Sequence, residues 1–413
     1  MEIPASLCLA CRGTKMLCGL AYCPVMVKVK MAPIRKELEL TRNIEGSTPP
    51  AIFVGRYGYP KVMAGPLLPP VFGDTSEYDS PEKWANSSID DVLRFRLSMV
   101  RGMSIINAKE ASNPSNAISK LQEISMSAES SPARLTSPRK ISSNFSFDFD
   151  TAPFGPTVSF DKLQIDGNMK MDRRFEKTYY DHDQKATSAI GQLYREGVPV
   201  SGIQRVLSSG SLGVRRKRKM VPTRWSITAI DDTISKQTIQ QLKGYQEVGE
   251  HMVFLRKVHK NMFAAIIIPG TWNFEWIEAW YPNTTWNMMN EGEAELMGDH
   301  EGYFGRKTYA KVGGCYYSSR LATSEFLTKI RRQAGALLIR EIHPGFNLPL
   351  GVWFVRENLR EMFSSEPSRF SSLEESLAYL SRHISVPLPK WVATSRLLHN
   401  LRTQTKLILP DAI

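Results

Sequence analysis

The 413-residue sequence contains no apolar run near the ~20 residues that a transmembrane helix needs. Its longest run, Met262 to Ile268 (MFAAIII), has the length of a buried strand. The first residues also lack the pattern of a secretory signal, because Glu2 stands where positive charge is required and Arg12 and Lys15 interrupt the apolar residues. These absences predict a cytoplasmic protein without a membrane partner.

Cysteine is scarce, and four of the five cysteines stand in one short segment, as Cys8, Cys11, Cys18 and Cys23. A chain of this length can bury a sufficient core without disulfides. Two closely spaced pairs, Cys8-x2-Cys11 and Cys18-x4-Cys23, suit a tetrahedral zinc ion held by four thiolates. An iron–sulfur cluster is the alternative, since it takes the same four ligands. We therefore predict a structural zinc knuckle over residues 1–28, with no open position for chemistry.

Acidic residues are outnumbered, with 41 Asp and Glu against 53 Lys and Arg, and the formal charge is +12. Such a balance favours polyanionic partners such as DNA or RNA. Acids are absent from the run RRKRK, which follows Gly210 and Gly213. A cationic run beside a glycine-rich turn can cradle phosphate, and a following tryptophan can stack on a base; a solvated loop is the alternative. The residues predicted to bind nucleic acid here are Arg215, Arg216, Lys217, Arg218, Lys219, Arg224 and Trp225.

A second candidate lies in TPPAIFVGRYGYPKVMAGPLLPP, residues 48–70. AIFVG reads as a short buried strand, and the following residues form a loop dense in glycine and proline. This loop carries Arg56, Tyr57, Tyr59 and Lys61. Cations and aromatic rings on a rigid loop can hold phosphates or stack on bases, and tyrosines packed on the core are the alternative.

Two pairs of acids raise the separate prediction of a metal-dependent enzyme. Asp148 and Asp150 share one face of the strand predicted for FSFDFD, and Asp231 and Asp232 follow WSITAID, which also reads as a strand. With a basic loop beside them, such carboxylates could hold Mg²⁺ or Mn²⁺ in a nuclease. The alternatives are a solvated face for the first pair and a helix cap at Asp232 for the second.

Three short β-rich runs, 251–258, 261–270 and 273–282, predict an antiparallel meander. The acidic stretch after Asn290 predicts a domain border. Beyond it, the sequence predicts helices and a strand at 336–342. One of these helices begins with a capping box at Ser371 and Glu374. We predict an α+β protein: the knuckle over 1–28, a large mixed domain with an antiparallel sheet over 29–289, a smaller α+β domain over 290–400, and a tail over 401–413.

The cysteine cluster, PPAIFVGRYGYPKVMAGPL and SGSLGVRRKRKMVPTRWSITAIDDT together resemble the archaeal Nre family of DNA repair proteins, over essentially the whole chain. The resemblance implies a DNA damage repair factor with a zinc finger at the four amino-terminal cysteines. It also implies a tail motif for PCNA, the sliding clamp, which would begin at Gln404, use Leu407 as its anchor and continue through Ile408 and Leu409. It implies no reaction.

The predicted function is therefore a DNA repair factor that binds DNA through its basic loops and docks on the clamp through its tail. A metal-dependent nuclease or nucleotide-processing enzyme is one alternative, with the acid pairs as its catalytic residues. An RNA-binding protein is the other, because a zinc knuckle and a positive charge suit RNA equally well.

Overall fold

The computed structural model describes residues 18–19, 42–138, 154–282, 284, 287, 293–346 and 350–403. The chain forms two compact units. The first unit lies within Cys23–Gln237 and Pro349–Glu357, and the second lies mainly within Thr238–Leu348 and Asn358–Ile413. In the described helices no segment has the length and apolar character to cross a membrane.

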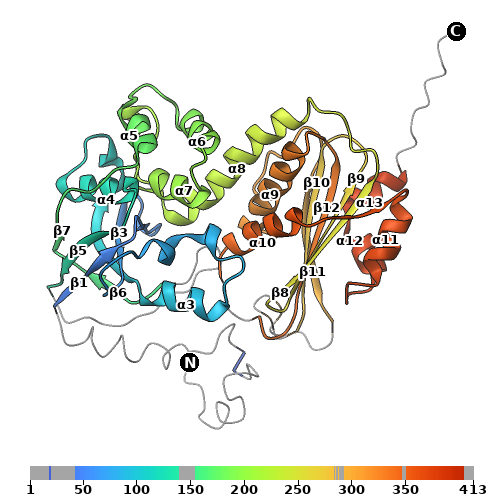
Figure 1. Ribbon diagram of the computed structural model, residues 1–413, viewed down its shortest axis with the longest axis horizontal. Helices are drawn as coiled ribbons and strands as arrows, with labels where there is room; N and C mark the ends of the chain where they lie inside the picture. Colours follow the sequence, from blue (N-terminus) through green and yellow to red (C-terminus); the bar gives the residue numbers. More distant parts are fainter. Residues whose placement is uncertain are drawn as a thin grey trace. The chain divides into compact units, whose positions relative to one another are not determined.

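The first unit contains two small sheets (Figure 1). The four-stranded sheet has the order β2 (Ile52–Val54), β3 (Lys61–Leu68), β4 (Val100–Asn107) and β6 (Thr157–Ser159). Strands β2, β3 and β4 pair antiparallel, and β4 pairs parallel with β6. The antiparallel three-stranded sheet has the order β1 (Asn43–Thr48), β5 (Ser131–Thr136) and β7 (Lys162–Ile165). The stretch after Ser130 therefore begins as a strand.

The first described α-helix of this unit, which starts at Ile89, has a side-chain cap. Ser88 has an extended backbone, and its hydroxyl accepts the Asp91 N–H at 3.0 Å, as at a helix N-cap. The α-helices are α3 (Ile89–Ser98), α4 (Asn116–Met126), α5 (Arg173–Tyr180), α6 (Ala186–Arg195), α7 (Val200–Ser208) and α8 (Thr223–Leu242). Short 3₁₀ turns are η1 (Ser76–Asp79), η2 (Pro81–Lys83), η3 (Ala108–Ser112) and η4 (Arg215–Lys217).

The core of this unit lies between its sheets and α4. Val62 and Leu68 from β3, Leu135 from β5, and Ile118 and Leu121 from α4 belong to one apolar cluster and are buried. Burying each such side chain contributes about 1.5–3 kcal/mol. This packing fixes strands β2–β4, from which the loops of the candidate site project.

The second unit is built on a six-stranded sheet (Figure 1). Its order is β11 (Glu295–Glu301), β10 (Asn273–Trp280), β12 (Gly335–Ile342), β9 (Asn261–Ile268), β8 (His251–Val258) and β13 (Ser368–Phe370). The strands predicted over 251–258, 261–270, 273–282 and 336–342 exist as β8, β9, β10 and β12, and β8 pairs antiparallel with β9. The predicted meander is wrong at β10, because β12 lies between β9 and β10 and runs parallel to β10. Both β9 and β12 are buried along their whole length, which suits central strands.

Helices cover both faces of this sheet. They are α9 (Gly314–Lys329), α10 (Trp353–Ser364), α11 (Leu373–Ser381), α12 (Leu388–Thr394) and α13 (Arg396–Thr403). Figure 1 shows α9 on one side of the sheet and α11 to α13 on the other. The cap of α11 is Ser372, which accepts the Glu375 N–H, one residue later than predicted at both positions.

Candidate nucleic-acid interface

The start of α8 overturns one prediction from the sequence. WSITAID lies inside this helix and not in a strand. Ile230 and Ile234, four residues apart, are both buried, whereas Trp225 is 48% exposed. This is the spacing of one helix face, and over seven residues it resembles strand alternation closely enough to mislead.

Of the two acid pairs, the structure describes Asp231 and Asp232, and these two do not form a metal site with other described residues. Asp231 is fully buried and accepts two hydrogen bonds from Arg356 Nη1, at 2.8 and 3.1 Å. Asp232 pairs with Lys236 at 2.7 Å and lies within α8, so the predicted helix cap at Asp232 is wrong. Asp148 and Asp150 lie outside the described residues. Across the described ranges no three His, Cys, Asp or Glu side chains gather as a metal site would require.

Two predicted sites fall largely outside what the structure describes. Of the four predicted zinc ligands, Cys8, Cys11 and Cys23 lie outside the described residues, and Cys18, which the structure describes, is half-buried. The tail residues Gln404, Leu407, Ile408 and Leu409 also lie outside them. The zinc knuckle and the clamp motif therefore stay predictions.

The basic run forms η4 and the residues that follow it. Arg215, Arg216, Lys217 and Lys219 are exposed. Arg218 is buried: its Nε donates to Gly213 O at 2.8 Å, its Nη2 donates to Tyr179 O at 2.7 Å, and its guanidinium lies 4.8 Å from the Tyr179 ring centre. Arg218 thus holds the run in place, and the other four cations face solvent.

The aromatic loop connects β2 to β3 over residues 55–60. Tyr57 is 81% exposed, and Arg56 lies against it, with Nη2 donating to the Tyr57 hydroxyl at 3.0 Å. Gly58 has a φ of +77°, a left-handed conformation that favours glycine at this turn. Lys61, the first residue of β3, is also exposed. The loop therefore presents the Tyr57 ring and Lys61 to solvent, whereas Arg56 is half-buried against Tyr57.

The structure brings this loop to the start of α8. The Tyr59 and Trp225 rings lie 5.8 Å apart between centres. The Val54 N–H donates to Thr223 Oγ1 at 2.9 Å, which ties β2 to the first turn of the helix. Ala108 bridges the two segments, because its N–H donates to Pro60 O and its carbonyl accepts from the Met220 N–H, both at 2.8 Å. Two segments that are distant in sequence thus form one surface.

A pocket of about 230 Å³ opens where these segments meet. We call it the arginine pocket; its described lining includes Phe53, Arg56, Tyr57, Met63, Arg101, Met103, Phe154, Pro222 and Arg224. Three of these residues are cationic, and none of the lining residues that the structure describes is acidic. Sequence reasoning identified Arg56, Tyr57 and Arg224 but missed Arg101 and Phe154.

Arg101, from β4, forms the deep wall of the arginine pocket. It is only 7% exposed, and its Nε and Nη2 donate to Thr157 Oγ1 at 3.1 and 2.6 Å. Its guanidinium lies 4.6 Å from the Phe53 ring centre and 5.1 Å from that of Phe154. No carboxylate in the described part of the chain pairs with it. Burial, and then the nearby charge of Arg96, lower the pKa of Arg101 to about 10, so it stays charged at neutral pH.

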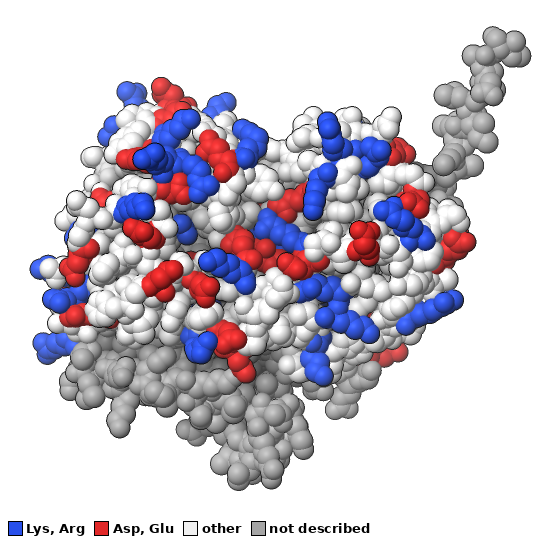
Figure 2. Space-filling view, viewed as in Figure 1, with Lys and Arg blue, Asp and Glu red and all other residues white. Residues whose placement is uncertain are grey.

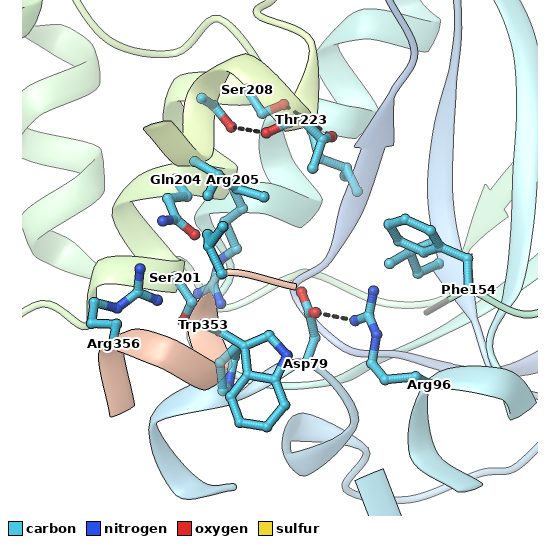
Figure 3. A pocket seen from close by; sticks show the side chains of 16 residues that line it. Asp79, Arg96, Phe154, Ser201, Gln204, Arg205, Ser208, Thr223, Trp353 and Arg356 are labelled. Atoms are coloured by element: carbon cyan, nitrogen blue, oxygen red, sulfur yellow. Dashed lines mark hydrogen bonds and ion pairs between the residues drawn. The ribbon is translucent and has the colours of Figure 1, made fainter. Parts of the chain in front are cut away.

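Two further arginines, Arg96 and Arg356, which we call the paired arginines, line a cavity of about 80 Å³ that shares Phe154 with the arginine pocket (Figure 3). Arg96 stacks on Phe154 at 4.9 Å and pairs with Asp79. Arg356 pairs with Asp231 and with Glu357. Each of these buried cations therefore has a carboxylate partner, in contrast to Arg101.

The surface charge is mixed elsewhere. On the face that Figure 2 draws, Lys and Arg are interspersed with Asp and Glu, and neither sign forms a continuous stripe. The excess of 12 positive charges therefore does not act as one field across this face. Local arrangements that hold cations without acids, such as the arginine pocket, matter more for recognising an anion.

Comparisons with known proteins identify a family that matches most of the chain. Residues 17–287 match the family described as archaeal Nre, N-terminal, and residues 301–408 match archaeal Nre, C-terminal. The chain is 44% identical to DNA repair protein NreB of Archaeoglobus fulgidus, over 96% of this chain and 98% of that protein.

Two further relatives are named DNA repair protein NreA. The one from Archaeoglobus fulgidus is 34% identical, over 91% of this chain and 93% of the relative, and the one from Haloferax volcanii is 32% identical, over 87% and 88%. No solved structure matches the chain. The chain belongs to the archaeal Nre family.

Proposed function

We propose that this protein acts in DNA repair and binds a nucleic-acid strand across the surface formed by the aromatic loop and the start of α8. Its relatives are named DNA repair proteins, which supports the role. The observation that carries the binding proposal is the convergence of the two predicted segments, with Tyr59 against Trp225 beside a pocket that contains arginines and no described acid.

The chemistry of the surface suits a strand. The binding surface comprises Arg56, Tyr57, Tyr59, Lys61, Arg224 and Trp225, with Arg215, Arg216, Lys217 and Lys219 beside it. Exposed cations neutralise phosphates and release counterions, which gives affinity without base specificity. Exposed rings such as Tyr57 and Trp225 stack on unpaired bases, at about 1–3 kcal/mol per base. The combination favours single-stranded DNA over duplex DNA.

Binding of a labelled single strand, measured by anisotropy across a salt series, tests this proposal. Replacing Arg215, Arg216 and Lys217 by Ala should flatten the salt dependence, by about one unit of slope for each phosphate that the variant no longer neutralises. Trp225→Ala should weaken binding about tenfold with little change of slope. Arg195→Gln, an exposed arginine of α6 outside the binding surface, is the matched control.

The same assay separates the alternative functions. Binding by the parent protein that is unchanged in both variants would overturn the proposed surface. Tighter binding to RNA of the same sequence would favour an RNA-binding protein. Cleavage that requires Mg²⁺ or Mn²⁺ and stops in EDTA would make the protein a nuclease. In that case Asp148, Asp150 and Asp232 would be tested first, because the Asp231 carboxylate is already held by Arg356.

Two finer parts of the proposal lie outside the described residues. We expect a structural zinc ion on Cys8, Cys11, Cys18 and Cys23, so Cys11→Ser should lower the zinc content to a small fraction of the parent's. We expect the tail from Gln404 to contact PCNA. A chain ended at Thr403 should lose retention on immobilised clamp and keep its DNA affinity.

A further inference from the structure

Arg101 has the environment of a binding residue. A buried charge without an opposite charge is costly, and proteins normally pair such groups with a carboxylate. Arg101 is 7% exposed, and in the described residues it has only the Thr157 hydroxyl and two aromatic rings as partners. Its remaining terminal nitrogen, Nη1, has no partner among those residues, and the side chain lines the arginine pocket. An anionic ligand would supply the missing charge.

The pocket's size restricts that ligand. Its volume of about 230 Å³ lies below the ~300 Å³ at which pockets for drug-sized ligands begin. It has room for a phosphate with its attached sugar, and not for a length of strand. Phe53, Met63, Met103 and Phe154 give it apolar walls, which suit the sugar.

The depth of Arg101 restricts the ligand further. Tyr57 is 81% exposed at the rim, whereas Arg101 is 7% exposed. A phosphodiester inside a strand continues through a sugar on both sides, so it cannot enter a narrow pocket end-on. A terminal phosphate has chain on one side only. It also carries about −1.5 to −2 charges and three acceptor oxygens, which match three guanidiniums better than the single charge of a diester.

We propose that the arginine pocket binds the terminal phosphate monoester of a nucleotide, with Arg101 contacting the phosphate from below and Arg56 and Arg224 contacting it at the rim. This inference rests on the proposed nucleic-acid surface, because the pocket opens into it. The monoester can belong to a strand end or to a free mononucleotide. The strand end is the source that the surrounding surface favours, since Tyr57, Tyr59 and Trp225 lie where the following bases would stack.

Matched oligonucleotides test the proposal. A short single strand of one sequence is prepared with a 5′-phosphate, with a 3′-phosphate, and with hydroxyl groups at both ends. Either the 5′-phosphorylated or the 3′-phosphorylated strand should bind the full-length protein about tenfold more tightly than the hydroxyl-ended strand. Hydrogen bonds from the arginines to a charged phosphate would account for a gain in affinity of this size. Arg101→Gln should remove this preference and leave affinity for the hydroxyl-ended strand within about twofold. Arg195→Gln should change neither the preference for the phosphorylated end nor the affinity for the hydroxyl-ended strand.

A second variant distinguishes loss of phosphate binding from loss of folding. Met103→Phe keeps every cation and fills the pocket, so it should also remove the end preference; a melting temperature near the parent's identifies a folded variant. Equal affinity of the parent for all three strands, with no competition by a deoxynucleoside monophosphate, would overturn the inference and leave the proposed function standing. A mononucleotide that binds through Arg101 without any strand binding would refute the proposed function and assign the pocket to a free nucleotide.

Discussion

Arg101 and Arg356 lie in the same compact unit, and both are almost inaccessible to solvent, but their surroundings differ. Arg356 pairs with Asp231 and Glu357. Arg101 has a hydroxyl and two rings, and no described carboxylate. Satisfied ion pairs inside a protein mainly hold its structure, whereas a buried cation without a counter-charge is ready for a ligand. The comparison distinguishes arginines that maintain the fold from one that is available for binding.

The largest effect should come from breaking the paired arginines. Arg356→Met leaves the Asp231 carboxylate buried without its partner and should lower the free energy of unfolding by about 3–5 kcal/mol. Urea denaturation measures this loss. A loss below about 1 kcal/mol would mean that Asp231 can be neutralised in another way, and the contrast with Arg101 would fail.

A smaller loss is expected where β2 is tied to α8. Thr223→Val removes the acceptor of the buried Val54 N–H and should cost about 1–2 kcal/mol. Thr223→Ser keeps the hydroxyl and should retain most of the stability. Both variants are compared by thermal unfolding. Equal stability of the Val and Ser variants would show that this bond does not position the pocket.

The paired arginines also predict a pH dependence through Glu82. Burial alone would raise the pKa of Glu82, but the Arg356 charge and two hydrogen bonds from Ser201 bring the pKa below its ordinary value of 4.5. The unfolded chain therefore binds this proton more tightly. The resulting stability is complete above about pH 4.5 and is lost as the pH falls through the folded-state pKa.

Glu82→Gln should therefore be less stable than the parent at neutral pH, by about 1 kcal/mol, and the difference should shrink toward about pH 3. Stability curves at several pH values check this, with the exposed Glu77→Gln as the control. A difference that stays constant with pH would place the effect in packing and not in the charge.

The smallest change in stability should come from Arg101. Arg101→Met removes a buried charge that no described carboxylate compensates and keeps much of the side chain's packing, so we expect the free energy of unfolding to stay within about 1 kcal/mol of the parent's, in either direction. Denaturation without any ligand measures it. A loss as large as that of Arg356→Met would make Arg101 a structural residue and end the comparison.

Local chemistry made much of the fold predictable. The strands at 251–258 and 261–270 were predicted because β-rich runs and turn residues are local signals, and the structure contains them as β8 and β9. The insertion of β12 beside β10 was not predicted, because the pairing of strands that are distant in sequence gives no signal in the local sequence. The helix at WSITAID was misread because its apolar spacing fits two periods.

The candidate site was predictable in its exposed parts. Arg56, Tyr57, Arg224 and Trp225 stand out as cations beside aromatic residues in glycine- and proline-rich sequence. Arg101 could not be identified from the sequence, since an arginine in a β-strand is usually exposed and nothing in VRGMSIIN indicates that this one is buried. Its environment depends on Phe53 and Phe154, which come from distant segments. The ion pair of Asp231 with Arg356 spans 125 residues and was equally hidden.

Trp225 has a consequence for spectroscopy. Six other described tryptophans are at most 8% exposed, namely Trp84, Trp272, Trp276, Trp280, Trp353 and Trp391, whereas Trp225 is 48% exposed. Among the described residues its indole is thus the one open to an aqueous quencher. Among the described tryptophans, acrylamide should quench mainly this ring, and a strand stacked on it should shield it. The protein carries an intrinsic optical reporter at the surface where we propose that nucleic acid binds, so a titration needs no added dye.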